Sequence, residues 1–388
     1  MNKDTIPFPT DAQKNVSLIA FSQFGMTFSF TFMMAFMPFY IINVSPYGHK
    51  ETMIFTGLIM GAAHIATAIS APFWGGLTSR FRPKFLFEMG FLCNGVLILL
   101  MGFTSNLYLL VLLRVAQGGL GGVSTIGIIF ISRLSPPDRV VRNVTLYQNA
   151  LTAGQLLGPP IGTYIAFFLG YRTAFVFATV FIFISLFFLH RHVVDILPQK
   201  LPTDSVIPYR KKIVFGWLLG IIATVQLTFL PSILPGILQN FQLEEGDALN
   251  LAGVIIMSYT ATAILGTYIF GRFSSQVGIR KAVAFACCSA SLLQISLFLS
   301  RGVLSFMIIR MIQTGFIAAV FPLTISIFAR GAGGGMIGFL NSARFWGNAA
   351  GPLLATFVLA YSTPFTLYIL IAFLTVASLW GFLKSGEV

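Results

Sequence analysis

The stretch Gly75-Gly76-Leu77-Thr78-Ser79-Arg80 returns 196 residues later as Gly271-Arg272-Phe273-Ser274-Ser275-Gln276. After the same interval, Arg114-Val115-Ala116-Gln117 returns as Arg310-Met311-Ile312-Gln313. Two further matches keep this order at intervals of 197 and 193 residues: Pro38 with Pro235, and Gly158-Pro159 with Gly351-Pro352. Landmarks at a nearly constant interval predict that the chain consists of two related halves in parallel orientation.

Composition places both halves in a membrane. Of 388 residues, 56% are hydrophobic and only 9% are charged, whereas soluble domains are about a quarter charged. Mean hydropathy is +0.86. Twelve apolar runs reach the roughly 20 residues that a helix needs to cross the bilayer: 16–43, 53–78, 84–104, 106–131, 142–168, 171–189, 213–239, 248–271, 280–300, 302–329, 335–361 and 363–384. We therefore expect an all-α membrane protein with 12 transmembrane helices in two pseudo-symmetric six-helix bundles.

The basic residues predict the orientation of these spans. Of the 24 Lys and Arg residues, 18 fall on the side of the two termini, and three fall in the opposite loops, at Lys50, Arg172 and Arg301. Cytoplasmic loops carry an excess of Lys and Arg, so we expect both termini in the cytoplasm. The net charge of +13 is scattered between apolar runs. This distribution argues against nucleic acid as a partner.

A polar segment with three prolines separates the halves. It follows the sixth apolar run and ends in the basic cluster Arg210-Lys211-Lys212. We expect residues 1–190 to form the N-terminal six-helix bundle, residues 191–212 a cytoplasmic linker, and residues 213–388 the C-terminal six-helix bundle.

Three motifs fall in register with the spans. Gly75–Lys84 (GGLTSRFRPK) connects the second and third spans, Arg114–Gly121 lies in the fourth, and Gly154–Gly162 (GQLLGPPIG) lies in the fifth. Together they resemble motifs of the major facilitator superfamily and, within it, of the twelve-span drug:proton antiporter group, over nearly the whole chain. The resemblance implies a monomeric small-molecule transporter of the bacterial inner membrane. It further implies alternating access, protons as the coupling ion, and no cofactor.

The first motif combines glycines at a helix end with a basic cluster. Gly75 and Gly76 allow a neighbouring backbone to approach closely. Arg80, Arg82 and Lys84 are placed to bond the C-terminal carbonyl groups of a helix or to meet anionic lipid headgroups. A gating role and a purely topological role both remain open.

The fifth-span motif repeats a glycine every four residues. Gly154, Gly158 and Gly162 therefore share one helix face, which permits a tight helix crossing, and Pro159 bends the helix. We expect this face to pack where the halves meet and move, with static packing as the alternative. The residues expected to act in gating or packing are Gly75, Gly76, Ser79, Arg80, Lys84, Gln117, Gly154, Gly158, Pro159, Gly162, Gly271, Ser275, Gln313, Gly351 and Pro352.

Acidic residues depart from the family pattern. The family's loop motif usually has Asp where this chain has Ser79, and the second half has Ser275 at the matching place. Of 11 acidic residues, only Glu88 falls within a span, close to one end. No carboxylate is available deep in the membrane to bind a cation and a proton in alternation.

Three arginines fall inside spans instead. An Arg at a lipid-facing helix centre costs about 2.5–3.5 kcal/mol, so each should face the protein interior or a ligand. Arg114 and Arg310 occupy matching motif positions and either fasten helices or bind substrate. Arg344 has no counterpart, since the matching position is Leu151. Its planar fork suits a carboxylate, which makes Arg344 our first candidate for holding an anionic substrate.

Other polar residues within spans are weaker candidates. His64 could carry a coupling proton, because histidine titrates near neutral pH, or it could simply be hydrogen-bonded in helix packing. We also expect four amide side chains to contribute to a substrate-binding cavity: Gln23, Gln226, Asn341 and Asn348. No spacing of the three cysteines or four histidines suits a metal site, and the HExxH pattern does not occur.

The sequence leaves two leading functions open. One is export of amphipathic compounds by proton antiport, which follows from the resemblance. The other is transport, in either direction, of an organic anion such as a polycarboxylate metabolite or a carboxylate siderophore, which follows from buried arginines without buried acids. A receptor or channel with a transporter fold is a remote alternative, and an enzyme is not expected.

Overall fold

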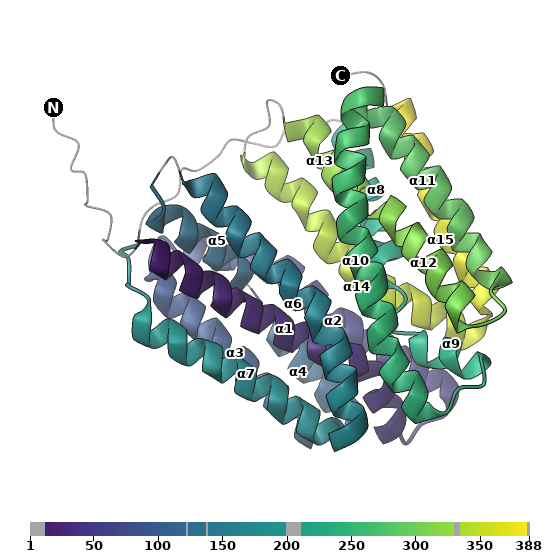
Figure 1. Ribbon diagram of the computed structural model, residues 1–388, viewed down its shortest axis with the longest axis horizontal. Helices are drawn as coiled ribbons and strands as arrows, with labels where there is room; N and C mark the ends of the chain where they lie inside the picture. Colours follow the sequence, from purple (N-terminus) through teal and green to yellow (C-terminus); the bar gives the residue numbers. More distant parts are fainter. Residues whose placement is uncertain (1–11, 122, 137–138, 199–210, 330–333, 386–388) are drawn as a thin grey trace.

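In the computed structural model, the described residues are 12–121, 123–136, 139–198, 211–329 and 334–385, and within these ranges there is no β-strand. Figure 1 shows the arrangement of the helices. Their bounds are α1 (Ala12–Val44), α2 (His49–Leu77), α3 (Pro83–Phe103), α4 (Leu107–Gly119), α5 (Val123–Leu134), α6 (Val140–Leu169), α7 (Tyr171–His192), α8 (Lys211–Thr228), α9 (Leu234–Asn240), α10 (Glu245–Val277), α11 (Ile279–Ser296), α12 (Val303–Ile317), α13 (Val320–Ala329), α14 (Gly334–Tyr361) and α15 (Pro364–Lys384).

These helices make the twelve expected membrane spans, because three spans are each built from two helices. The pairs are α4 with α5, α8 with α9, and α12 with α13. Pro231 has no amide hydrogen and interrupts the span of α8 and α9. The glycine-rich stretch that begins at Gly118 ends α4. The expected runs agree with the helices to within a few residues at most ends, whereas the three interruptions were not predicted.

The apolar character of the helices fits a multi-pass membrane protein. Within the described residues, eight helices or helix pairs are long and apolar enough to cross a membrane by length and composition alone. The four remaining spans are α4–α5, α6, α8–α9 and α14. Of these, α6 and α14 carry prolines inside the helix, Pro159 and Pro160 in α6 and Pro352 in α14.

The two halves form bundles that meet at one end and diverge at the other. The first bundle contains α1–α7 and the second contains α8–α15, and the bundles separate toward the side on which the chain ends (Figure 1). Extensive contacts between the bundles join α2 to α14 and α6 to α10. Residues 199–210 of the expected linker lie outside the described residues.

Glycines bring the bundles together at the closed end. A Cβ atom added at Gly61 of α2 would lie 2.9 Å from the carbonyl oxygen of Ala349 in α14. One added at Gly253 of α10 would lie 2.8 Å from the carbonyl oxygen of Pro159 in α6. A larger side chain at either position would therefore push the two bundles apart at this end.

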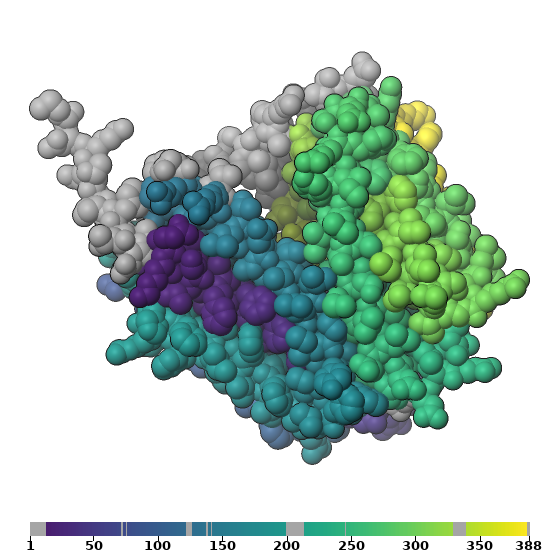
Figure 2. Space-filling view, in the orientation of Figure 1, coloured from purple at the N-terminus to yellow at the C-terminus, as the bar shows by residue number. Residues whose placement is uncertain are grey.

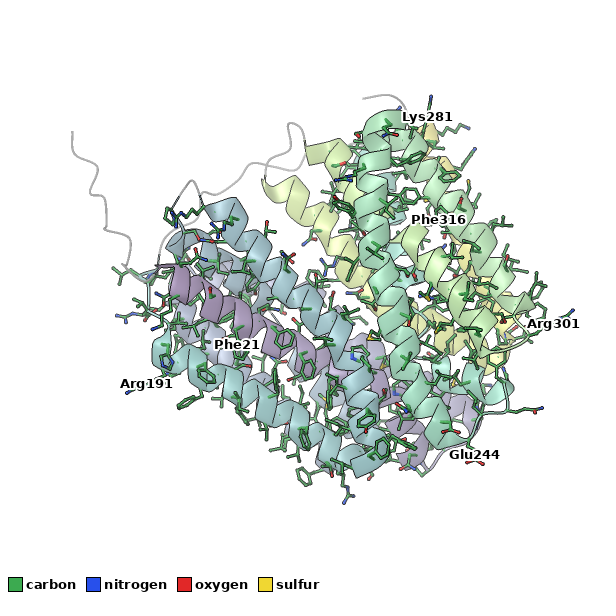
Figure 3. All side chains as sticks on the ribbon, in the orientation of Figure 1. Phe21, Arg191, Glu244, Lys281, Arg301 and Phe316 are labelled. Carbon is green, nitrogen blue, oxygen red and sulfur yellow. The ribbon has the colours of Figure 1, made fainter. Side chains whose placement is uncertain are left out.

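Charged side chains mark the two ends of the molecule. In Figure 3, Arg191 and Lys281 lie at the ends of the bundles nearer to the termini, whereas Glu244 and Arg301 lie at the opposite ends. Figure 2 shows a recess between the bundles on the side of the termini. The fold therefore holds a central space that is closed at one end.

Candidate solute-binding cavity

A cavity of about 450 Å³ lies between the two bundles. Its wall comes from α1, α2 and α6 of the first bundle and from α8, α10, α13 and α14 of the second. This volume is in the range of small-molecule sites, about 300–1,000 Å³. Much of the wall is apolar, with Phe30, Met34, Leu227, Ile256 and Phe321 as examples. Among the described lining residues there is no Asp or Glu.

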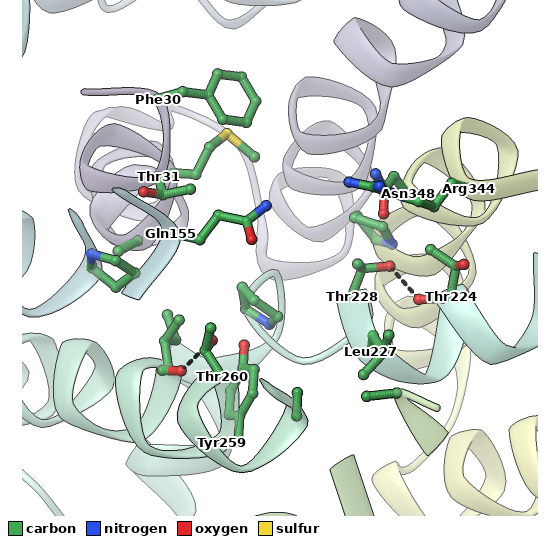
Figure 4. A pocket seen from close by; sticks show the side chains of 18 of the residues that line it. Phe30, Thr31, Gln155, Thr224, Leu227, Thr228, Tyr259, Thr260, Arg344 and Asn348 are labelled. Atoms are coloured by element: carbon green, nitrogen blue, oxygen red, sulfur yellow. Dashed lines mark hydrogen bonds between the residues drawn. The ribbon is translucent and has the colours of Figure 1, made fainter. Parts of the chain in front are cut away.

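Arg344 is the charged side chain of this wall. It projects from α14 into the cavity, as Figure 4 shows, and its side chain is exposed there. Within the part of the chain that the structure describes, it has no hydrogen bond and no ion pair. The cavity therefore presents an uncompensated positive charge and a set of free N–H donors.

Three further polar side chains of the wall have no hydrogen bond to any described residue. They are His64 on α2, Gln155 on α6 and Asn348 on α14. The His64 ring packs edge-on to Phe30, with 6.0 Å between ring centroids. Figure 4 shows the Gln155 carboxamide pointing toward Arg344 and Asn348. The free polar groups thus come from both bundles.

Arg114 and Arg310 lie behind the wall rather than on it. Both are fully buried. Arg114 donates to the carbonyl oxygens of Ile59 (2.9 Å) and Met60 (3.3 Å) in α2, and to the Gln117 side chain. Its guanidinium lies 5.3 Å from the centre of the Phe30 ring. Arg114 therefore fastens α4 to α2, and it contacts the cavity wall through Phe30, which lines the cavity.

Arg310 has an analogous position in the second bundle. It donates to the carbonyl oxygens of Gln226 (2.9 Å) and Leu227 (3.0 Å) at the end of α8, and to Gln313 Oε1 (2.5 Å). It also lies 4.8 Å from the ring centre of Tyr259, which lines the cavity. These contacts favour the fastening role over direct substrate contact for both motif arginines.

The structure places the buried glutamines away from the cavity. Gln23 donates to Thr27 Oγ1 (2.9 Å) and accepts from the Tyr147 hydroxyl (2.6 Å). Gln226 donates to Thr375 Oγ1 (2.6 Å) and accepts from Gln313 Nε2 (2.6 Å). The expectation that they help to form the cavity is therefore corrected: both join helices within one bundle.

Asn341 is also absent from the cavity wall. It is exposed on α14, about one turn before Arg344 and nearer to the open end. Of the four amide side chains proposed from the sequence, only Asn348 lines the cavity.

Lys84 of the first motif bonds the end of a neighbouring helix. Its Nζ donates to the carbonyl oxygens of His190 (2.9 Å) and Val193 (2.7 Å) at the C-terminus of α7. It also lies 3.7 Å from Glu88 Oε1. Such carbonyl groups were one of the two partners expected for the basic cluster, and the negative end of the helix dipole favours them. Arg80 is exposed.

The two motif serines make the same local bond in both halves. Ser79 Oγ donates to the carbonyl oxygen of Gly76 (2.7 Å), and Ser275 Oγ donates to that of Arg272 (2.7 Å). Gly75 and Gly76 lie in the last turn of α2, which ends at Leu77. A Cβ at Gly76, or at Gly271, the counterpart of Gly75, would meet nothing within 4 Å. The close approach expected at Gly76 therefore does not occur in this conformation.

The fifth-span glycines lie inside the first bundle. A Cβ at Gly154 would lie 2.7 Å from the amide nitrogen of Phe28 in α1, and one at Gly158 would lie 2.8 Å from its carbonyl oxygen. At Gly162 a Cβ would overlap the carbonyl oxygen of Phe32. Our expectation that these glycines lie between the halves is therefore wrong. Gly351 makes the corresponding close contact with α8 in the second bundle.

The sequence did not predict the positions of Gln155 and of the glycines at the closed end. Gln155 stands inside the quoted motif, four residues before Pro159, and both line the cavity. That spacing places the two side chains on one helix face, which was the available signal. Gly61 and Gly253 belong to none of the three motifs, so only the packing of the bundles identifies them as contact residues.

Comparison with known proteins agrees with this geometry. The family profile described as Major Facilitator Superfamily matches residues 19–299. The multidrug resistance protein MdtG of Klebsiella pneumoniae is 24% identical over 364 residues, which cover 91% of this chain and 88% of that protein. The staphyloferrin B transporter of Staphylococcus aureus is 22% identical over 374 residues, which cover 92% and 89%. The crystal structure of the nucleoside transporter NupG superposes with a TM-score of 0.77 at 12% identity, covering 98% of this chain and all of that one.

Proposed function

This chain belongs to the major facilitator superfamily, and we propose that it carries a small organic anion with at least one carboxylate group across the membrane. The chain is a multi-pass transporter and not an enzyme. The observation that carries the proposal is Arg344, whose guanidinium faces the cavity without a partner among the described residues. A carboxylate matches its planar fork and can accept two charge-assisted hydrogen bonds from it.

Electrostatics supports an anion over a cation. Two like charges about 4 Å apart repel by on the order of 4 kcal/mol at the effective dielectric near a protein surface. No described lining residue carries a negative charge that would offset Arg344 for a cationic solute. Arg114 and Arg310 place two further positive charges behind Phe30 and Tyr259.

The relatives support a transporter but divide on the substrate. One relative is named a staphyloferrin B transporter, and another is named for multidrug resistance. Proton-coupled export of amphipathic compounds is therefore our second candidate. The aromatic and methionine side chains of the wall favour it, and His64 is its candidate for the proton site.

Orientation of the cavity follows from the loop charges. With both termini in the cytoplasm, the recess opens to the cytoplasm and the closed end faces outward. Cysteine introduced at Val194, on a background without other cysteines, tests this arrangement in intact cells. Rapid labelling by an impermeant reagent would place this segment outside and reverse the orientation.

A binding panel on purified protein separates the two candidates. Carboxylate anions and lipophilic cationic dyes are measured at pH 6 and pH 8 with the wild type and with His64→Gln. We expect anions to bind and dyes not to bind. Tight dye binding that weakens at low pH in the wild type, but not in His64→Gln, would instead establish the second candidate.

A further inference from the structure

The carboxamide of Gln155 faces the cavity from the bundle opposite to Arg344. Gln155 lies on α6 of the first bundle, and Arg344 and Asn348 lie on α14 of the second. Figure 4 shows the three side chains converging on one region of the cavity. Gln155 has no hydrogen bond to any described residue, so both its N–H₂ and its carbonyl oxygen are available to a solute.

The hydroxyl groups of the threonines in the wall already donate hydrogen bonds to backbone carbonyl oxygens. Four of them donate to the carbonyl oxygen four residues earlier on their own helix, over distances of 2.7–2.9 Å: Thr224, Thr228, Thr260 and Thr267. Thr31 donates to the carbonyl oxygen of Gly154 at 2.9 Å. A hydroxyl group has one proton and two lone pairs, so each of these oxygens can still accept.

The cavity therefore offers two kinds of partner. Arg344 offers only donors, whereas the threonine oxygens and the oxygens of Gln155 and Asn348 are acceptors. A solute made only of carboxylates and hydrocarbon would use the donors and leave the acceptors to water. A solute that also carries hydroxyl groups can use both.

On these grounds, and resting on the proposed function, we infer that the solute is a hydroxylated carboxylate that bridges the two bundles. Its carboxylate binds Arg344 of α14, and its hydroxyl group donates to Gln155 of α6. Arg344 and Gln155 belong to different bundles. A solute that binds both residues therefore links the two bundles, and its hydroxyl group makes the contact with the first bundle.

Pairs of acids that differ by hydroxyl groups alone test the inference. Citrate is compared with tricarballylate, malate with succinate, and tartrate with succinate, by direct binding to the purified full-length protein. In at least one pair we expect the hydroxylated acid to bind about tenfold more tightly, the effect of one hydrogen bond near the upper end of the usual range.

Variants then identify the residue that recognises the hydroxyl group. Gln155→Met keeps the length of the side chain and removes its hydrogen bonds, and it should bring the affinity ratio of that pair close to one. Gln148→Met, on the same helix two turns earlier and outside the cavity wall, should leave the ratio unchanged. Arg344→Ala should weaken both acids of the pair and leave their ratio intact.

The outcomes distinguish this inference from the function on which it rests. Equal binding within every pair, or a ratio that survives Gln155→Met, overturns the hydroxyl contact while leaving anion transport standing. Failure of every acid to bind the wild type overturns both. A melting temperature of Gln155→Met equal to that of Gln148→Met shows that misfolding does not cause the change.

Discussion

Arg310 and Arg344 are the same residue type in the same bundle, yet their surroundings are opposite. Arg310 is fully buried and donates to two carbonyl oxygens and one glutamine. Arg344 faces the cavity and bonds no described residue. Arg310 has a counterpart in the first half, Arg114, whereas Arg344 has none. The repeated arginines belong to the scaffold, and the unrepeated one is available to a solute.

The two scaffold arginines also differ from each other. Arg310 bonds the carbonyl oxygens of Gln226 and Leu227 where α8 ends. Leu227 would ordinarily bond the amide of residue 231, but this is a proline without an amide hydrogen. Arg310 thus satisfies carbonyl groups that the break in the seventh span leaves free. Arg114 bonds Ile59 and Met60 inside the continuous helix α2, where the backbone is already paired.

The largest effect should come from Arg310→Ala. It removes three charge-assisted hydrogen bonds and leaves carbonyl groups unpaired in a buried place, which should lower the free energy of unfolding by about 3 kcal/mol or more. Denaturant titration in mixed micelles measures this loss. A variant as stable as the wild type would show that α8 and α9 need no such support.

Arg114→Ala should have a smaller effect of the same kind. Its carbonyl partners keep their helical hydrogen bonds, so we expect a loss of about 1–2 kcal/mol. The same titration, run beside Arg310→Ala, compares the halves directly. A loss equal to that of Arg310→Ala would mean that the break after α8 does not set the difference.

The smallest change in stability is expected for Arg344→Ala. The side chain has no partner among the described residues to lose, so the free energy of unfolding should stay within about 0.5 kcal/mol of the wild type. A large destabilisation would place Arg344 with the scaffold arginines and remove the contrast on which the proposed function rests.

Sequence alone predicted the spans and the repeat because both depend on local information. The length of an apolar run sets a span, and a constant interval reveals two halves. The rotation of each helix about its axis could not be predicted in the same way, because packing against other helices sets it. Gln23 and Gln226 were predicted to line the cavity but bond within their own bundles. Gln155 lines the cavity and was not predicted, although it lies within the fifth-span motif. Arg344 could be singled out because the matching position in the first half is Leu151, so this arginine is not part of the repeat.

The most direct test of anion binding by Arg344 is calorimetric titration of wild type, Arg344→Ala and Arg344→Lys with the carboxylate that the wild type binds most tightly. We expect Arg344→Ala to lose about 1.5–3 kcal/mol, roughly a ten- to hundredfold loss of affinity. Arg344→Lys should recover only part of it, because an ammonium group lacks the bidentate fork. Unchanged affinity in a folded Arg344→Ala protein would contradict the assignment of Arg344 as the anion-binding residue.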